Sequence, residues 1–137
     1  MLTILVIDDE PQIRRFLRIS LTASGYRVLE AETGAAGIET AAAERPDLVI
    51  LDLGLPDIDG QEVITAIREK GPVPIIVLSV RSDETDKVEA LDRGADDYMV
   101  KPFGIGELMA RIRAASRPRG GAEADPDRLV VGGLTID

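Results

Sequence analysis

The sequence has no cysteine, no histidine and no tryptophan, and only 3% of its 137 residues are aromatic. Without cysteine there is no disulfide, thiolate nucleophile or zinc-thiolate site, and without histidine there is no imidazole for acid-base catalysis or transition-metal binding. No apolar run approaches the roughly 20 residues of a transmembrane helix. The start, MLTILVIDDE, turns acidic too early for a signal peptide. The chain is therefore expected to be cytoplasmic, with chemistry that depends on carboxylates.

The composition is acidic, with 25 Asp and Glu residues against 16 Lys and Arg and a net charge of −9. Such a chain does not attract nucleic acid through its own field, so direct DNA binding by these residues is not expected. Clustered carboxylates repel one another until a divalent cation intervenes, and their oxygen ligands suit hard cations. Mg²⁺ or Mn²⁺ is the expected cofactor.

Two kinds of segment alternate along the chain. Five are short, apolar and rich in β-forming residues, which predicts strands at 2–7, 26–31, 47–53, 73–79 and 96–101. Between them lie apolar residues at helical spacing, such as Ile13, Phe16, Leu17 and Leu21, then Val63, Ile64 and Ile67, then Val88 and Leu91. The alternation predicts a single (βα)₅ domain of the α/β class, with a parallel sheet covered by helices on both faces.

Polar side chains stand where four of these strands end. They are Asp8, Asp9 and Glu10 after the first strand, Asp52 in the third, Ser79 in the fourth and Lys101 in the fifth. Any one of them has an ordinary explanation as a helix cap, a loop hydrogen bond or a solvated surface group. Parallel strands, however, bring these ends to one edge of the sheet, where open α/β folds bind ligands. A cation is expected there, because like charges about 4 Å apart repel by about 4 kcal/mol at an effective dielectric of about 20.

An aspartate that attacks phosphorus requires this kind of setting, because the phosphoryl group must have its negative charge neutralised. Magnesium bridging Asp9 and Asp52 serves one phosphoryl oxygen. Lys101 neutralises a second phosphoryl oxygen as a point charge on a flexible side chain, and the Ser79 hydroxyl donates a hydrogen bond to the third. The set predicts phosphoryl transfer to Asp52.

The strings ILVIDDE, LVILDLGLPDIDG, IIVLS and GADDYMVKPF, in this order and spacing, resemble the receiver domains of response regulators over residues 2–116. The chain looks like a CheY-like receiver of the OmpR/PhoB-like class of two-component transcriptional regulators. This resemblance implies a doubly wound, flavodoxin-like sandwich with the strand order 2-1-3-4-5. It also implies that Asp52 accepts a phosphoryl group from a sensor histidine kinase. The domain then catalyses only its own phosphorylation and slow autodephosphorylation, and is not an enzyme toward other substrates.

The resemblance also assigns the metal ligands. Asp8 and Asp9 match the family's acidic pair, with Asp9 a direct ligand of Mg²⁺ and Asp8 acting through water. Asp52 is the phosphoacceptor and a further ligand. Gly54, two positions later, is implied to offer its backbone carbonyl to the metal.

On the other side of the site, the resemblance implies that Ser79 contacts the phosphoryl group and that Lys101 pairs with it, next to a cis Lys101–Pro102 bond. Tyr98 matches the switch aromatic, which turns inward when Ser79 moves toward phosphate and so changes the surface of the fourth helix, fifth strand and fifth helix. Val80 departs from the pattern, because related domains mostly have a smaller residue there, such as alanine. Its bulk is expected to narrow donor access or to hinder Tyr98.

Charged residues of both signs occur along positions 87–113, which include the last two predicted helical stretches and the last predicted strand. Mixed charges on a helix usually form only a solvated surface. In the OmpR/PhoB-like class, however, matching positions form salt bridges across a two-fold dimer, with Lys87 facing Glu107 and Asp97 facing Arg111. A phosphorylation-promoted homodimer is therefore predicted, with an interface of Lys87, Asp96, Asp97, Glu107, Arg111 and Arg113.

The last residues have a different composition. Residues 117–127 are rich in Pro, Gly and charge and are typical of a linker, and RLVVGGLTID at 128–137 has the composition of a strand pair. In the resembling class a winged-helix DNA-binding domain begins here, so 128–137 are interpreted as the start of such a domain, whose remainder contacts promoter DNA. An edge strand of the receiver itself is the alternative interpretation.

Other functional classes fit these residues less well. A calcium loop with Gly60 at its sixth position would put Leu55 and Ala66 at ligand positions, and no glycine-rich motif opens the first helix for a dinucleotide. A metal-dependent phosphatase with an aspartyl nucleophile is the enzymatic alternative, but Gly54 stands where such an enzyme commonly has a second Asp. A purely structural interaction module would bind no phosphoryl group.

Overall fold

The computed structural model describes residues 1–116, in which five strands and five helices alternate. The strands are β1 (Thr3–Ile7), β2 (Arg27–Ala31), β3 (Leu48–Leu51), β4 (Ile75–Ser79) and β5 (Asp97–Val100). The helices are α1 (Pro11–Ala23), α2 (Gly34–Glu44), α3 (Gly60–Lys70), α4 (Glu84–Arg93) and α5 (Ile105–Ala115). The predicted (βα)₅ order is confirmed, and each strand is one to three residues shorter than its apolar segment.

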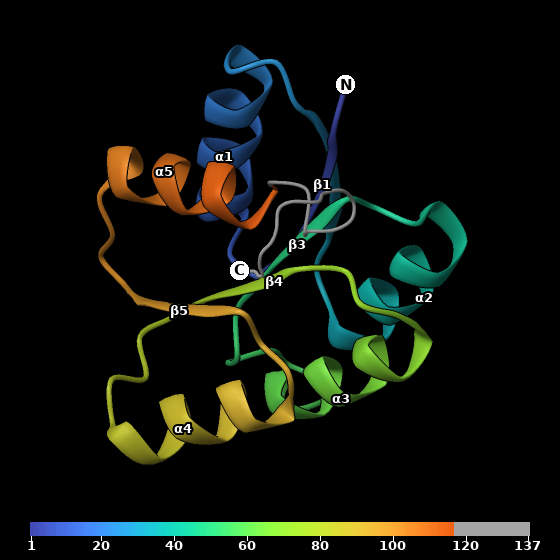
Figure 1. Ribbon diagram of the computed structural model, residues 1–137, viewed down its shortest axis with the longest axis vertical. Coiled ribbons are helices and arrows are strands. Elements are labelled where there is room, and N and C mark those ends of the chain that lie inside the picture. The colour runs from blue at the N-terminus through green and yellow to red at the C-terminus, as the bar shows by residue number, and fades with distance from the viewer. Residues whose placement is uncertain (117–137) are drawn as a thin grey trace, which may run out of the picture.

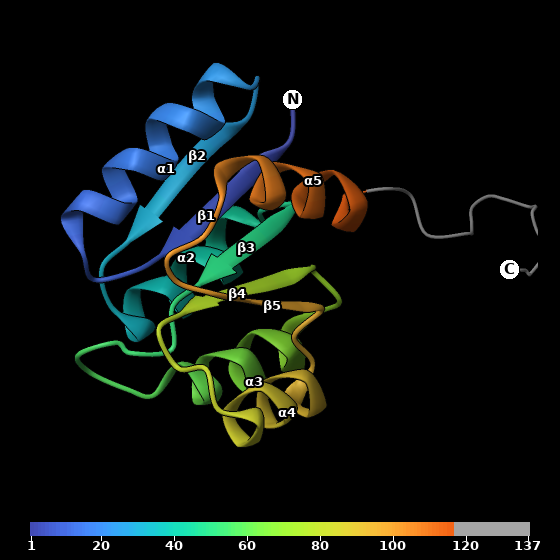
Figure 2. The same cartoon turned by 90° about the vertical axis from the view of Figure 1, so that its left-hand side faces the viewer.

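The five strands form one parallel sheet in the order β2-β1-β3-β4-β5, as the resemblance implied. Helices α1 and α5 cover one face, and α2 and α3 cover the other (Figure 1). On the side of the molecule that carries α4, β5 and α5, the edge strand β5 runs between the two helices (Figure 2). Because all strands are parallel, their carboxyl ends share one edge of the sheet.

The core has two layers, one on each face of the sheet. Alternate residues of β1 serve opposite layers: Leu5 and Ile7 pack toward α2 and α3, and Ile4 and Val6 pack toward α1 and α5. Strands β3 and β4 are buried along their whole length. Their continuous apolar runs follow from this position, since a central parallel strand has no solvent-facing side.

Helix α4 differs from its sequence-based interpretation. The spacing of Val88 and Leu91 correctly predicted a helix, but these side chains do not form its buried face: they are 46% and 43% exposed. Ala90 is the buried residue of the helix. The small Ala90 side chain lets α4 lie close to its neighbours, while the two larger apolar residues face outward. The outer surface of α4 therefore carries apolar groups among its charges.

The loop between β3 and α3 is fixed to the start of α2. Asp57 accepts hydrogen bonds from the backbone N–H groups of Gly34 (2.8 Å) and Ala35 (2.9 Å). Thr33 caps the same helix by accepting from Ala36 N. The Ala35 and Gly34 bonds hold the pKa of the Asp57 carboxyl below its ordinary value, because they stabilise the charged form at the positive end of the helix. The loop that follows Asp52 is thus anchored to the first turn of α2.

At the opposite end of the sheet, Arg68 of α3 binds two connecting segments, the one from α3 to β4 and the one from α4 to β5. Its guanidinium donates to the carbonyls of Gly71 (3.1 Å), Val73 (2.8 Å) and Gly94 (2.6 Å). It also lies 3.2 Å from the Asp96 carboxylate, which accepts from the backbone N–H of Ile75 as well. Asp96, one of the predicted interface residues, is therefore engaged within the chain.

The predicted linker and the start of a further domain, residues 117–137, lie outside the described residues. Among residues 1–116, no helix combines the length and apolar character needed to cross a bilayer.

Candidate functional site

The carboxyl ends of the strands surround a surface depression of about 230 Å³. Its lining comes from the segments after β1, β3, β4 and β5. The lining residues are Asp9, Glu10, Asp52, Gly54, Ser79, Val80, Arg81 and Lys101. The structure therefore brings together, at one edge of the sheet, most of the polar residues that the sequence placed at strand ends.

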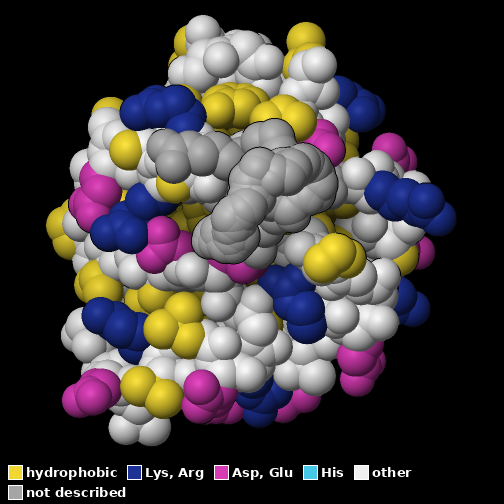
Figure 3. All heavy atoms as spheres, in the orientation of Figure 1, with side chains coloured by type: hydrophobic (Ala, Val, Ile, Leu, Met, Phe, Trp, Pro, Cys, Tyr) yellow, Lys and Arg dark blue, Asp and Glu magenta, His cyan; other side chains and the backbone are white. Residues whose placement is uncertain are grey.

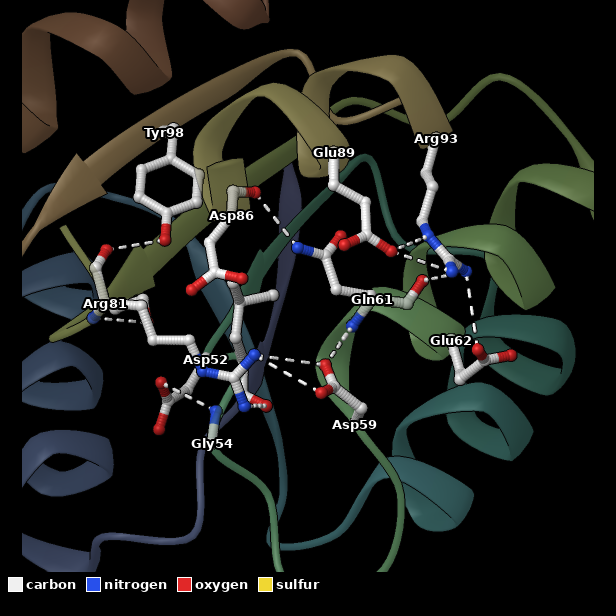
Figure 4. Close-up of polar contacts among 12 residues, drawn as sticks. Asp52, Gly54, Asp59, Gln61, Glu62, Arg81, Asp86, Glu89, Arg93 and Tyr98 are labelled. Carbon is white, nitrogen blue, oxygen red and sulfur yellow. Dashed lines mark hydrogen bonds and ion pairs between the residues drawn. The ribbon is translucent and has the colours of Figure 1, made fainter. Parts of the chain in front are cut away.

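Asp52 occupies the centre of this edge. It directly follows β3, and its backbone N–H donates to the carbonyl of Ile7 at 2.9 Å, so the position is fixed to the end of β1. The residue is only 7% exposed. Its Oδ1 accepts from the backbone N–H of Gly54 at 3.3 Å (Figure 4). A buried, anchored carboxylate at the mouth of a depression is placed to react with a ligand that enters it.

Lys101 reaches into the same place from the end of β5. Its Nζ lies 3.0 Å from Asp8 Oδ2, 3.1 Å from Glu10 Oε1 and 3.6 Å from Asp52 Oδ2. Burial disfavours the charged amine, but the hydrogen bond and charge of Asp8, the charge of Asp52 and the bond to Glu10 outweigh it and raise the pKa of Lys101. The amine is therefore a permanent cation among three carboxylates. The Lys101–Pro102 peptide bond is cis, as the resemblance implied.

The acidic group comprises Asp8, Glu10 and Asp52, which can each place one carboxylate oxygen within 4.8 Å of the other two. Burial raises the pKa of Asp8, although the Glu10 backbone N–H and Lys101 favour its charged form. A divalent cation would offset this cost of burying charge, and three carboxylate oxygens suit a hard cation. The donor set therefore fits such an ion.

The composition of this group differs from the predicted ligands. Asp9 lines the depression but does not belong to the group, whereas Glu10, to which no metal role was assigned, does. Both residues follow β1, and the strand end alone does not fix which of three consecutive acidic side chains turns toward Asp52. Gly54 also lines the depression, and the role of its carbonyl as a metal ligand stays a prediction.

Ser79 and Tyr98 meet beside the depression. Ser79 is fully buried at the end of β4, and its Oγ accepts from the backbone N–H of Arg81 at 3.1 Å. The Tyr98 ring is 8% exposed, and its hydroxyl donates to the Arg81 carbonyl at 2.6 Å (Figure 4). Burial raises the pKa of the Tyr98 hydroxyl. The aromatic that was predicted to switch lies in the inward position.

Val80 lies at the rim of the depression with 73% of its surface exposed. Its side chain points toward solvent, while the Tyr98 ring is buried. Both expected effects of Val80, on access to the depression and on the movement of Tyr98, stay predictions.

The predicted interface residues lie on α4, β5 and α5. Arg111 forms ion pairs within the chain, at 2.8 Å to Asp97 and 2.9 Å to Glu107, and these two partners raise its pKa. The Lys87 amine lies 6.0 Å from the centre of the Tyr98 ring. Arg113 is exposed on α5. Acidic and basic side chains of the described residues are interspersed over the face drawn in Figure 3.

Comparison with known proteins identifies this arrangement. The family model for the response regulator receiver domain matches residues 4–113. The chain belongs to the response regulator receiver family. Among solved structures, this receiver is similar to the response regulator TrrA of Thermotoga maritima, described as a complex with Mg(2+)-BeF. The TM-score is 0.77 and the identity 37%, over 84% of this chain and 99% of that one.

Two curated relatives place the receiver more closely. It is 56% identical to the KDP operon transcriptional regulatory protein KdpE of Escherichia coli over 138 aligned residues, which cover 100% of this chain and 61% of the relative. It is 55% identical to KdpE of Mycobacterium tuberculosis, with 96% and 58% covered. The strings IRRFLRISL, DLGLPDIDG, LSVRSDETDK and KPFGIGEL predict a similarity to the Kdp regulator, and these identities confirm it. The chain spans about three-fifths of the length of these relatives.

Proposed function

We propose that Asp52 accepts a phosphoryl group from a sensor histidine kinase, within a two-component transcriptional regulator. The observation that supports this most directly is the joint position of Asp52 and Lys101: a 7% exposed carboxylate lies 3.6 Å from a buried ammonium at the mouth of a depression. Asp8, Glu10 and Asp52 offer a hard cation an oxygen site in the same place. Mg²⁺ is the proposed ion. The ligands proposed from the family resemblance are Asp8, Asp9, Asp52 and the Gly54 carbonyl, and Glu10 is a further candidate because it belongs to the acidic group.

The proposed transfer is a substitution at phosphorus. An Asp52 carboxylate oxygen forms the new P–O bond while the bond to the donor's leaving group breaks, and that group departs with the electron pair. Bound Mg²⁺ supplies charge neutralisation at the phosphoryl oxygens. Lys101 is close enough to Asp52 to pair with one oxygen, and the Ser79 hydroxyl binds another. Lys101 and Ser79 thus orient the phosphoryl group and offset its charge, and Asp52 alone forms a covalent bond with it.

Incubation with acetyl phosphate and Mg²⁺ tests this proposal. The intact mass of the wild-type protein is expected to rise by about 80 Da, the mass of a phosphoryl group. Chelation of the metal before mixing is expected to prevent the adduct, because three neighbouring carboxylates then repel the incoming anion. Catalytic release of phosphate without an adduct would favour a phosphatase, and an unmodified protein with no phosphate release would contradict both.

We further propose that phosphorylation promotes a two-fold homodimer through α4, β5 and α5, and that an attached effector domain then binds promoter DNA. The exposed Val88 and Leu91 add apolar area to this surface. Lys87 and Glu107 are proposed to pair between chains. Arg111 pairs with Asp97 of its own chain in the structure. In the dimer, Arg111 is proposed to pair with Asp97 of the other chain, either in addition to this contact or in place of it. Such exposed pairs contribute only about 0 to 1 kcal/mol each, but they fix orientation.

A charge exchange tests the dimer. In the presence of Mg²⁺ and beryllofluoride as a phosphoryl mimic, Lys87→Glu and Glu107→Lys are each expected to weaken self-association, measured by analytical ultracentrifugation, by about tenfold. Mixing the two variants is expected to restore dimers, since each chain then presents charges opposite to its partner's. If the mixture associates no better than either variant alone, Lys87 and Glu107 do not meet across the interface.

A further inference from the structure

Arg81 lies two residues after Ser79, and its backbone connects the two residues assigned to switching. Its N–H donates to Ser79 Oγ at 3.1 Å, and its carbonyl accepts from the Tyr98 hydroxyl at 2.6 Å. Figure 4 shows the Tyr98 ring directed at this carbonyl. Any displacement of the backbone at Arg81 therefore changes both hydrogen bonds at once. The position of this one peptide segment determines whether the buried Tyr98 has a partner.

The side chain of Arg81 binds the loop after β3, whereas its backbone binds Ser79 and Tyr98. Its Nη1 lies 3.3 Å from both carboxylate oxygens of Asp59, and its Nη2 donates to the carbonyl of Leu53 at 3.4 Å. Leu53 directly follows Asp52, and Asp59 precedes α3. The guanidinium thus ties the loop after β4 to both ends of the loop after β3. A guanidinium is suited to this because it presents several donors in a rigid plane.

Asp59 also belongs to the frame of α3 and α4. It caps α3 by accepting from the backbone N–H of Gln61 at 2.9 Å. The Gln61 side chain is 3% exposed, and its Nε2 donates to the Asp86 carbonyl in α4 at 3.0 Å. These contacts, drawn in Figure 4, link Asp59 to the start of α3 and, through Gln61, to α4. An ion pair to Asp59 consequently fixes Arg81 relative to both helices.

We propose that the Arg81–Asp59 ion pair is a positioning pair that holds the segment after Ser79 and so sets the equilibrium between the buried and exposed positions of the Tyr98 ring. The inference rests on the proposed role of Tyr98 as the switch, and it assigns Arg81 and Asp59 no contact with the phosphoryl group. Loss of the pair frees the Arg81 backbone, which weakens the hydrogen bond from Tyr98. The ring then leaves its buried position more often before any phosphoryl group arrives.

The test uses ¹⁹F NMR of protein with 3-fluorotyrosine at its two tyrosines, Tyr26 and Tyr98. The shift of each signal between H₂O and D₂O reports ring exposure, and Tyr26 is the internal reference. In Arg81→Ala, the ratio of exposed to buried Tyr98 is expected to rise by about two- to fivefold, the range that one partly exposed ion pair supplies. Asp59→Asn is expected to do the same while still capping α3, because asparagine is an equally good cap.

Three controls separate positioning from general loosening. The double variant is expected to show no more Tyr98 exposure than either single variant, because both remove one contact. Arg81→Lys, which keeps the charge, is expected to give an intermediate ratio, and Arg15→Ala, an exposed arginine of α1, is expected to give the wild-type ratio. Unchanged ratios in Arg81→Ala and Asp59→Asn, or additive effects in the double variant, would overturn the proposal. The acetyl phosphate adduct of the wild type is read separately, so its absence would count against the role of Asp52 and not against this pair.

Discussion

The Asp52→Asn variant is expected to show no increase in intact mass after incubation with Mg²⁺ and acetyl phosphate, whereas the wild type gains about 80 Da. The amide has nearly the shape of the carboxylate and still offers an oxygen to the Gly54 N–H, which lies 3.3 Å from Asp52 Oδ1. It has no anionic oxygen to attack phosphorus, and it weakens the cation site by one charge. The expected effect is therefore complete loss of phosphorylation in a folded protein.

A second aspartate on the same strand provides the control. Asp47 precedes β3 and Asp52 follows it, so the two lie at opposite ends of β3. Asp47 accepts a hydrogen bond from the backbone N–H of Thr3 at 2.7 Å and lies away from the depression. Asp47→Asn is expected to gain the phosphoryl group as the wild type does. Phosphate on Asp52→Asn, located by peptide mapping to another carboxylate, would show that a different residue accepts it.

Lys101 stays paired within the site even when the Asp52 carboxylate is lost. Removal of the Asp52 carboxylate leaves Asp8 and Glu10 still paired with Lys101 at 3.0 and 3.1 Å. Under the proposed function, the amine turns from these carboxylates toward a phosphoryl oxygen when Asp52 is modified, and its 3.6 Å separation from Asp52 makes that movement short. A cation near Asp8 and Glu10 would release Lys101 from them, because it takes over their neutralisation.

The features that sequence alone predicted are those set by periodicity and chain order. The alternation of apolar segments with helical spacing predicted the (βα)₅ order, and the rule that parallel strands share an edge placed Asp52 beside Lys101, 49 residues later in the sequence. These inferences need no knowledge of side-chain rotamers. The cis Lys101–Pro102 bond came from family resemblance only, because X–Pro bonds in general favour trans.

The features that sequence did not predict depend on which way individual side chains turn. The pattern of Val88 and Leu91 is equally compatible with a buried and an outward stripe, and only the packing of Ala90 distinguishes them. Glu10 enters the acidic group through a side chain that bends toward Lys101, which a string of acidic residues does not encode. Arg81 binds Asp59 across a 22-residue separation, so no local pattern signals the pair.

Gly60→Ala is expected to cause the largest loss of stability among the single changes considered. Gly60 opens α3, and its N–H donates to the Leu53 carbonyl at 2.9 Å, so the two backbones lie in direct contact. A Cβ at this position would collide with the Leu53 Cα and lie 2.8 Å from the Asp52 carbonyl oxygen. Because the obstacles are backbone atoms of the segment next to β3, they cannot rotate away. The free energy of unfolding is expected to fall by about 3 kcal/mol or more.

Chemical and thermal unfolding of Gly106→Ala provides the matched control. Gly106 lies within the first turn of α5, and a Cβ there meets no atom within 4 Å. The same Gly-to-Ala change is expected to be neutral or to stabilise by up to about 1 kcal/mol, because alanine favours helix and restricts the unfolded chain. For Gly60→Ala, a midpoint about 10 °C below the wild type is expected from a loss of this size. A Gly60→Ala protein within about 0.5 kcal/mol of the wild type would mean that α3 begins farther from the Asp52 segment, because an added methyl group would then fit between them.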